Sequence, residues 1–138
     1  MSMKYLLDTN VVSEPLRPKP SRKVLRKLGS HGGETAIASI VWHELLFGCA
    51  RLPESRRREA IERYLEEVVL ASFPILDYDR MAAEWHARER GRLEAAGKTA
   101  PFIDGQIAAI ASVNDLVLVT GDKADFRGFK ELRVESWA

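Results

Sequence analysis

Residues 116–122 read LVLVTGD, and they give the clearest indication of the fold class. Leu116 to Val119 form an unbroken run of leucine and valine, which predicts a strand buried on both faces. Such strands are typical of parallel sheets, because helices cover both faces of those sheets. Asp122 follows the run after Thr120 and Gly121, at the carboxyl end of the strand, where open parallel sheets carry their functional groups.

The same alternation of apolar runs and helical patterns extends outward over the whole chain. Further strands are predicted at Lys4 to Leu7, Thr35 to Ala38, Phe73 to Leu76 and Leu132 to Val134. Helices are predicted over 11–16, from an N-cap at Ser21 through Leu28, from an N-cap at Ser39 through Cys49, from Pro53 to Val68, over 79–96, and from Pro101 onward. Strands that alternate with helices favour an α/β fold with a mainly parallel central sheet covered on both faces.

Size and composition indicate one domain, over residues 1–138, because the 138 residues contain no repeat and no linker. No apolar run approaches the length of a membrane span and the single cysteine excludes an intramolecular disulfide, so we expect a cytoplasmic protein with no membrane partner.

The net charge of +1 conceals three basic clusters, which are explained either by solvated helix faces or by a face for a polyanion. The clusters are Arg17, Lys19, Arg22, Lys23, Arg26 and Lys27; Arg51, Arg56, Arg57 and Arg58; and Arg88, Arg90 and Arg92.

Four acids stand where predicted strands end or predicted helices begin: Asp8, Glu44, Asp104 and Asp122. A carboxylate is costly in apolar surroundings, and four that converge on one spot repel each other unless a cation lies between them. Hard oxygen ligands favour Mg²⁺ or Mn²⁺. Such an ion lowers the pKa of a bound water and neutralises charge on a phosphate, so the pattern predicts phosphodiester hydrolysis.

Each acid alone also has an ordinary structural explanation. Asp8 can cap the short helix that follows it, Glu44 lies where the helix macrodipole favours an acid, and Asp122 can cap a turn that ends at Phe126. Asp125 is an alternative to Asp122 as the fourth acid. The prediction of a site therefore depends on all four acids meeting at one edge of the sheet.

Two neutral side chains stand beside the acids in the sequence. Asn10 can hold a metal-bound water or a phosphate, and Thr120 can bond to a carboxylate or a water at the strand end. The histidines show no metal-ligand spacing, so we expect surface or packing roles for His31, His43 and His86.

Together these motifs resemble the PIN-domain ribonucleases, in particular the VapC-type toxins of bacterial and archaeal toxin–antitoxin pairs. The resemblance covers essentially the whole chain, and the order and spacing of the motifs fit that family. The motifs are LLDTN at 6–10, SIVWHELLFG at 39–48, FIDGQIAAIA at 102–111 and LVLVTGDKADF at 116–126.

The resemblance implies a three-layer α/β/α fold and an endoribonuclease that cleaves RNA with an activated water. It also implies Mg²⁺ or Mn²⁺ as cofactor, a homodimer, and inhibition by a cognate antitoxin protein. Related sequences often carry Asn where Asp122 stands and an acid where Asp125 stands, which leaves the identity of the fourth acid open. The implied catalytic and metal-binding acids are Asp8, Asp104 and Asp122, with Glu44 acting through a water, and Thr9, Asn10 and Thr120 match the positions around them.

Two other hypotheses remain beside the nuclease. An aspartate-based phosphotransfer or receiver-like domain would need a phosphorylated aspartate after a central strand, for which Asp77 is the candidate. A dehalogenase-like site would need an aspartate at position 10, where the chain has Asn. A catalytically silent PIN-like module that binds RNA would keep the fold without cleavage, although the presence of all four acids argues against it.

Overall fold

The computed structural model describes residues 2–138, which form a five-stranded parallel sheet with helices on both faces. The strand order is β3-β2-β1-β4-β5, and every neighbouring pair is parallel. The central strand β1 places Leu6 beside Ala36 on one side and Leu118 on the other. The strands are β1 (Tyr5–Leu7), β2 (Thr35–Ala38), β3 (Ile75–Leu76), β4 (Val117–Val119) and β5 (Val134–Glu135). The predicted parallel α/β fold is therefore confirmed.

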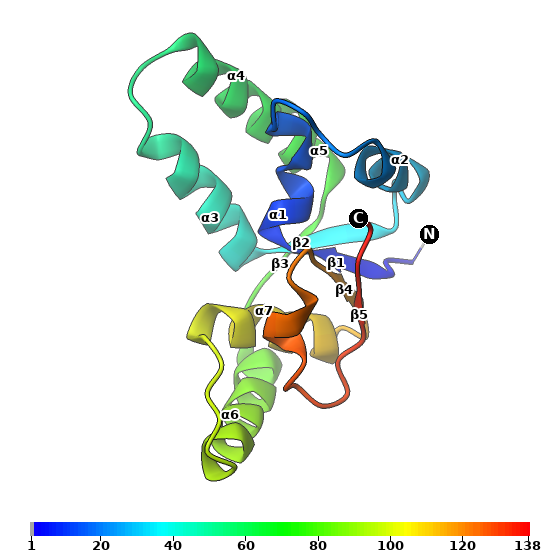
Figure 1. Cartoon of the computed structure of the whole chain (residues 1–138), viewed down its shortest axis with the longest axis vertical. Coiled ribbons are helices and arrows are strands. Elements are labelled where there is room, and N and C mark those ends of the chain that lie inside the picture. The colour runs from blue at the N-terminus through cyan, green and yellow to red at the C-terminus, as the bar shows by residue number, and fades with distance from the viewer. Residues whose placement is uncertain (1) are drawn as a thin grey trace.

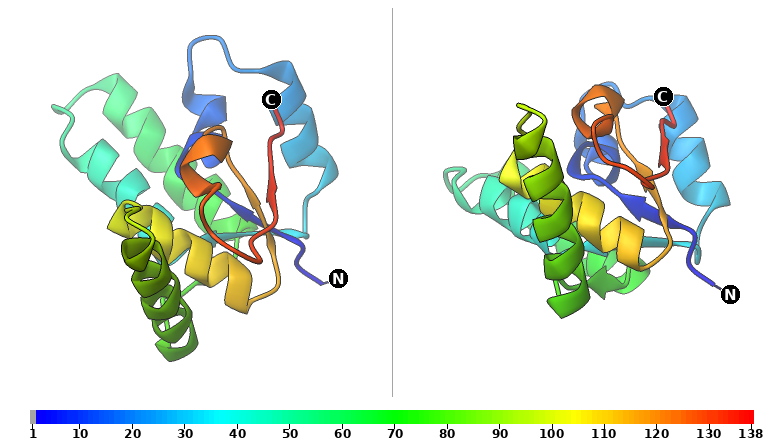
Figure 2. Two further views of the ribbon diagram at one scale, coloured as in Figure 1. Left: turned by 60° about the horizontal axis from the view of Figure 1, so that its bottom comes forward. Right: turned by 90° about the horizontal axis from the view of Figure 1, so that it is seen from below.

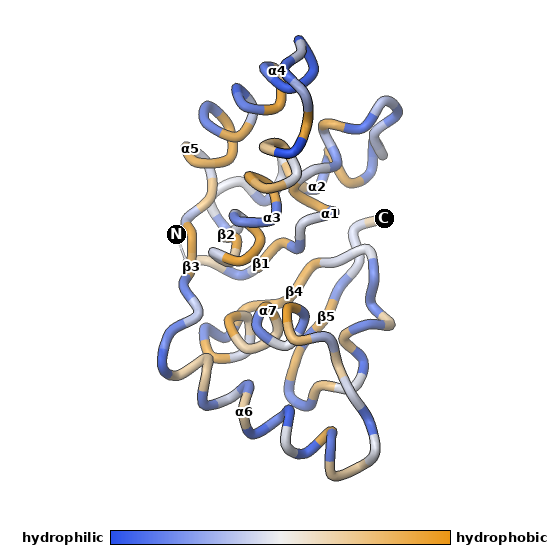
Figure 3. Tube along the Cα trace, turned by 90° about the vertical axis from the view of Figure 1, so that its left-hand side faces the viewer, coloured by the Kyte–Doolittle hydropathy of each residue, from blue (hydrophilic) through white to orange (hydrophobic). Residues whose placement is uncertain are grey.

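Three layers follow from the order of the strands. The chain moves from β1 outward to β2 and β3, and then returns past β1 to β4 and β5. Because crossovers between parallel strands are right-handed, a reversal of direction moves the connecting helices to the opposite face of the sheet. Helices α1 to α5 accordingly lie on one side, and α6 and α7 on the other (Figures 1 and 3). The helices are α1 (Thr9–Val12), α2 (Arg22–Ser30), α3 (Ser39–Ala50), α4 (Arg56–Tyr64), α5 (Leu70–Ser72), α6 (Arg80–Ala95) and α7 (Phe102–Val113).

Two predicted helix boundaries were wrong. Ser39 is the first residue of α3 and not its N-cap, because β2 runs into the helix without a loop and extended Ala38 takes the cap position. The single helix expected over 11–16 is divided into α1 and a 3₁₀ turn, η1 (Glu14–Leu16), which has a proline in its first turn. The N-cap predicted at Ser21 is present, since its hydroxyl accepts a bond from the amide of Val24 at 3.3 Å.

The core lies between the sheet and its two helical layers. Leu6, Leu7, Ile37, Leu118 and Val119 are completely buried, as the continuous apolar runs predict. Helix α6 packs along α7, which lies against the sheet (Figure 2). Within residues 2–138, no helix combines the length and the apolar character needed to cross a bilayer.

Candidate active site

The site begins where the direction of the sheet reverses, between β1 and its neighbour β4. The connections after these two strands leave on opposite faces, which opens a crevice at their carboxyl ends. Asp8 directly follows β1 and Thr120 directly follows β4. The amide of Asp8 donates to the carbonyl of Val119 at 2.9 Å, so the parallel ladder itself positions this carboxylate at the edge.

Asp8 is held from two sides. The amide of Thr9 donates to Asp8 Oδ1 at 2.8 Å, which makes Asp8 the N-cap of α1, as its ordinary explanation predicts. The hydroxyl of buried Thr120 donates to Oδ2, also at 2.8 Å, and accepts a bond from the amide of Asp122 at 3.0 Å. Burial nevertheless raises the pKa of Asp8, with a contribution from the charges of Asp122 and Asp125, and the two hydrogen bonds only oppose this.

Asp122 is tied by Asn10 to α1, the helix that follows the neighbouring strand β1. The side-chain amide of Asn10 donates to Asp122 Oδ2 at 2.9 Å, and its oxygen accepts from the amide of Gly121 at 3.1 Å. The predicted cap by Asp122 is absent, because its side chain makes no bond to the turn η3 (Lys123–Phe126) that it precedes. Asn10 thus fixes the loop after β4 against α1.

Two further acids come from the two helical layers. Glu44 on α3 accepts a bond from the hydroxyl of Thr9 at 3.3 Å, and burial together with the charge of Asp8 raises its pKa. Asp104 lies in the first turn of α7. Desolvation raises its pKa to about 6, followed by the charges of Asp8, Asp125, Glu44 and Asp122. The acids that the sequence separates by up to 114 positions, from 8 to 122, are therefore close enough to perturb one another.

A pocket of about 340 Å³ collects these side chains. Asp125 does not line it and lines another hollow instead. The charge of Asp125 nevertheless raises the pKa of Asp104 more than the charge of Asp122 does. The structure therefore brings both candidates for the fourth acid near the others and places only Asp122 in the pocket wall. The lining residues are Asp8, Thr9, Asn10, Ser13, Arg17, Glu44, Ile103, Asp104, Ile107 and Asp122.

The donor chemistry of the pocket suits a hard divalent cation. Burial, together with the charges of neighbouring acids, raises the pKa of Asp8, Glu44 and Asp104, so a cation between them would stabilise their ionised forms. Within the described part of the chain, no three acidic, histidine or cysteine side chains form a ready-made metal cage. Mg²⁺ does not require one, since it keeps several waters and binds through one or two carboxylates.

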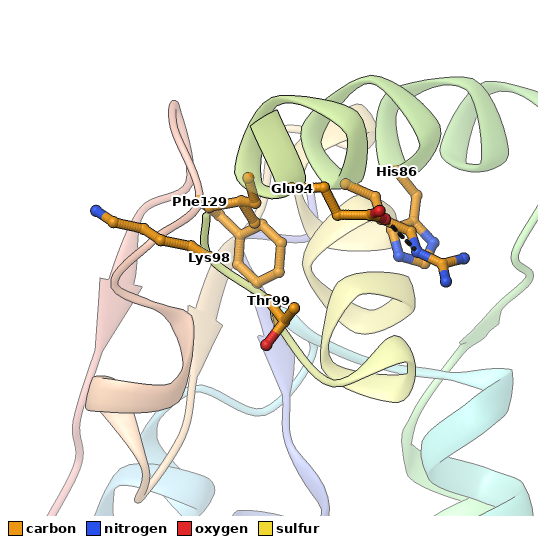
Figure 4. A pocket seen from close by; sticks show the side chains of 8 residues that line it. His86, Glu94, Lys98, Thr99 and Phe129 are labelled. Atoms are coloured by element: carbon orange, nitrogen blue, oxygen red, sulfur yellow. Dashed lines mark ion pairs between the residues drawn. The ribbon is translucent and has the colours of Figure 1, made fainter. Parts of the chain in front are cut away.

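Another pocket lies elsewhere, between α6 and the segment that leads into α7 (Figure 4). This pocket of about 290 Å³ contains His86, Lys98 and Thr99, and Arg90 and Glu94 form an ion pair at its edge. It contains none of the four acids. His86 is buried and its Nδ1 lies 2.9 Å from the Tyr78 hydroxyl, which agrees with the packing role expected for it.

Two polar residues of the pocket wall, Ser13 and Arg17, were not predicted as site residues from the sequence. Ser13 lies one helical turn after Thr9 and its hydroxyl donates to the Thr9 carbonyl at 2.8 Å, so the i, i+4 spacing was an available signal. Arg17 was recognised only as one member of a basic cluster. It is the one basic side chain in the wall of the acidic pocket, among the residues that the structure describes.

Comparison with known proteins agrees with this geometry. A family model described as PIN domain matches residues 5–132. Toxin FitB of Neisseria gonorrhoeae is 36% identical over 124 residues, which cover 88% of this chain and 89% of FitB. Ribonuclease VapC2 of Haemophilus influenzae is 30% identical over 135 residues, 98% of each protein. A solved structure of DNA-bound VapBC from Salmonella typhimurium is similar with a TM-score of 0.86, at 27% identity and over 99% of both chains.

Proposed function

Because the chain belongs to the PIN-domain family, we propose that it is a metal-dependent endoribonuclease, the toxin of a type II toxin–antitoxin pair. The observation that carries the proposal is the convergence of Asp8, Glu44, Asp104 and Asp122 in one pocket at the reversal point of the sheet. The names of the relatives, a toxin and a ribonuclease, support the same activity.

The proposed cofactor is Mg²⁺ or Mn²⁺, held by Asp8, Asp104 and Asp122, with Glu44 acting through a water. When bound, such an ion would supply positive charge at the phosphate and would lower the pKa of the attacking water, so that the water loses a proton more readily. Thr120 and the Thr9 amide orient the Asp8 carboxylate, and Asn10 orients that of Asp122. Partners of this kind fix the ligand geometry and typically affect metal affinity or activity about 10–100-fold.

Asp104 has a second role in the proposal, as the acid whose protonation limits activity. Its pKa of about 6 means that a substantial fraction of the molecules carry a proton there in mildly acidic solution. A divalent ion binds the ionised form, so ion binding releases this proton and strengthens as the pH rises through 6. Ile103 and Ile107 in the pocket wall limit the access of water around this carboxylate.

The phosphotransfer hypothesis is not supported. Asp77 follows β3, an edge strand, and its exposed side chain does not line the acidic pocket. A receiver-like site would require that aspartate within a cluster of acids. The silent RNA-binding module remains the alternative that the experiment below excludes or supports.

We propose two protein partners, a cognate antitoxin and a second copy of the chain. Large apolar side chains remain exposed on α3 and α7, and surface of this kind marks protein interfaces. The exposed fractions are 43% for Leu46, 56% for Phe47, 50% for Phe102 and 47% for Ile103. The compartment proposed for the pair is the cytoplasm, where RNA substrates are present.

The proposal is tested by cleavage of RNA with the purified, antitoxin-free protein. A labelled RNA with single-stranded loops is suitable, because unpaired bases are the ones that proteins reach. We expect internal cleavage with Mg²⁺ or Mn²⁺, none with EDTA, and none by Asp104→Asn. The matched control, Asp77→Asn, removes an exposed acid outside the pocket and should cleave like the unmodified protein.

Three outcomes would contradict the proposal. Full cleavage in EDTA would show that the reaction does not need a divalent ion. Full activity of Asp104→Asn would show that Asp104 is not a catalytic residue. RNA binding without cleavage under either ion, over a broad set of RNAs, would favour the silent module.

A further inference from the structure

Arg17 occupies an unusual place for a basic residue. Among the described residues it is the one cation in the wall of the acidic pocket, whose other charged groups are Asp8, Glu44, Asp104 and Asp122. It also lines a second hollow of about 330 Å³, which shares Asn10 and Asp122 with the first. The remaining wall of the second hollow includes Ser136 and Trp137, where the end of the chain lies beside α2 (Figure 1). Arg17 therefore stands on the boundary between the two hollows.

The guanidinium of Arg17 is paired through its Nε, and its two Nη groups are free in the part of the molecule that the structure describes. Its Nε lies 3.6 Å from Glu14 Oε2, and this carboxylate also accepts a bond from the amide of Ser21 at 3.3 Å. Glu14 is only 8% exposed, so its position is well defined. Within residues 2–138 this is the only ion pair of Arg17, which leaves its two Nη groups available for a ligand.

The backbone around Arg17 is also restrained. Its own amide donates to the carbonyl of Glu14 at 3.1 Å. Pro15 lies two residues before Arg17, and Pro18 follows it directly. A residue directly before proline is confined to extended conformations. Arg17 has this conformation, with φ −74° and ψ 149°. The backbone that carries the guanidinium is therefore fixed in one conformation and is not a mobile loop.

Arg17 does not act as the internal counter-ion of the acids. Within residues 2–138 its guanidinium forms no ion pair with Asp8, Glu44, Asp104 or Asp122, although it lines the same pocket. Its ion pair with Glu14 is long, at 3.6 Å, and the Arg17 side chain is more than half exposed, so the pair contributes little to stability. Neither structural role accounts for a positioned arginine beside four carboxylates.

We propose that Arg17 binds the RNA phosphate next to the one that is cleaved, and so guides the strand from the acidic pocket into the second hollow. The inference rests on the proposed nuclease function. A polyanion that enters a pocket of carboxylates needs a cation for each phosphate that the divalent ion does not reach. Arginine suits this role, because its planar fork bonds two phosphate oxygens at once.

The test separates binding from chemistry. In an Asp104→Asn background, which should bind RNA without cleaving it, the affinity for a single-stranded oligonucleotide is measured at several salt concentrations. We expect Arg17→Gln to weaken binding roughly tenfold and to reduce the slope of log affinity against log salt by about 0.7, the value for one phosphate contact on a single strand. In the active protein, the same change should raise KM about tenfold and leave kcat within about threefold.

Two variants complete the design. Arg26→Gln removes an exposed charge of α2 that lines neither hollow, and it should leave both the salt slope and KM unchanged. Arg17→Lys keeps the charge but lacks the planar guanidinium that bonds two phosphate oxygens. Compared with Arg17→Gln, it should therefore restore the salt slope and only part of the affinity. Melting temperatures of the variants show whether the fold is kept.

The outcomes also distinguish this inference from the proposed function. If the unmodified protein cleaves RNA while Arg17→Gln keeps the same KM and salt slope, the role of Arg17 is refuted and the nuclease stands. An equal effect of Arg26→Gln would likewise refute it in favour of a diffuse basic face. If the unmodified protein neither binds nor cleaves RNA, the proposed function itself fails.

Discussion

Replacement of Asp104 by Asn should stabilise the ion-free protein while it abolishes activity. The pKa of Asp104 is raised from 3.8 to about 6 by desolvation and by the neighbouring acids. A raised pKa means that the folded chain holds the proton more tightly than the unfolded chain, so ionisation of Asp104 opposes folding. The penalty is absent below pH 3.8, grows up to about pH 6, and is constant above that.

The size of the effect follows from the shift. A change from 3.8 to about 6 is about two pKa units, and each unit corresponds to roughly 1.4 kcal/mol, which gives an upper value of about 3 kcal/mol at neutral pH. Because the side chain is half-buried and not fully buried, solvent screens the cluster and reduces this value. We expect Asp104→Asn to raise the free energy of unfolding by about 1–2 kcal/mol at about pH 7.5, and by less than about 0.5 kcal/mol near pH 4.

The assay is urea denaturation in EDTA at both pH values, with thermal melting as a second measurement. A gain of 1–2 kcal/mol corresponds to a rise of roughly 3–10 °C in Tm for a chain of this length. Saturating Mg²⁺ should reduce or reverse this difference in stability between Asp104→Asn and the unmodified protein. A ligand stabilises the protein that binds it, and here that is the unmodified protein. The reasoning is refuted if Asp104→Asn is no more stable than the unmodified protein near neutral pH, or if its gain is as large near pH 4.

Three further predictions concern packing, the fourth acid and pH. A Cβ at Gly105 would lie 2.3 Å from Nε2 of buried His86, so Gly105→Ala should destabilise the fold by about 1–3 kcal/mol in urea denaturation. Gly91→Ala on α6, where nothing lies within 4 Å, should instead stabilise it by about 0.5–1 kcal/mol, and an unchanged or increased stability of Gly105→Ala would contradict the close contact of Gly105 with His86. Asp122→Asn should reduce cleavage at least about tenfold. Asp125→Asn should mainly shift the pH profile of kcat/KM to lower pH. The reverse pattern would make Asp125 the fourth acid. Mn²⁺ affinity should fall as the solution is acidified through about pH 6, and a flat profile from pH 5 to 8 would exclude a carboxyl of raised pKa from the ion site.

The sequence was sufficient to predict the sheet because its central strands β1, β2 and β4 are largely buried on both faces. Runs such as Leu116 to Val119 have no polar side to obscure them, and all five predicted strands are present. Helix boundaries were less accessible, since Ser39 has a typical capping side chain but follows β2 without a loop. Whether a serine caps a helix or begins it depends on the path of the preceding strand, which the local sequence does not specify.

The acids of the site were predictable, and the contacts that position them were not. Asp8 and Asp122 stand at strand ends in the sequence, so the parallel sheet alone brings them together. The bond from Thr9 to Glu44 and the location of Arg17 depend on how α1, α3 and the segment after η1 pack in three dimensions. No periodicity in the chain reports such contacts between elements.

The central claim is that the converging acids form one site for a divalent ion. It is tested most directly by titration of the ion-free protein with Mn²⁺, followed by electron paramagnetic resonance, for the unmodified protein and Asp8→Asn. We expect Mg²⁺ to displace Mn²⁺ from the unmodified protein, and we expect Asp8→Asn to lose this binding while it remains folded. Equal Mn²⁺ binding by the two proteins would contradict it, because the ion would then lie outside the acidic pocket.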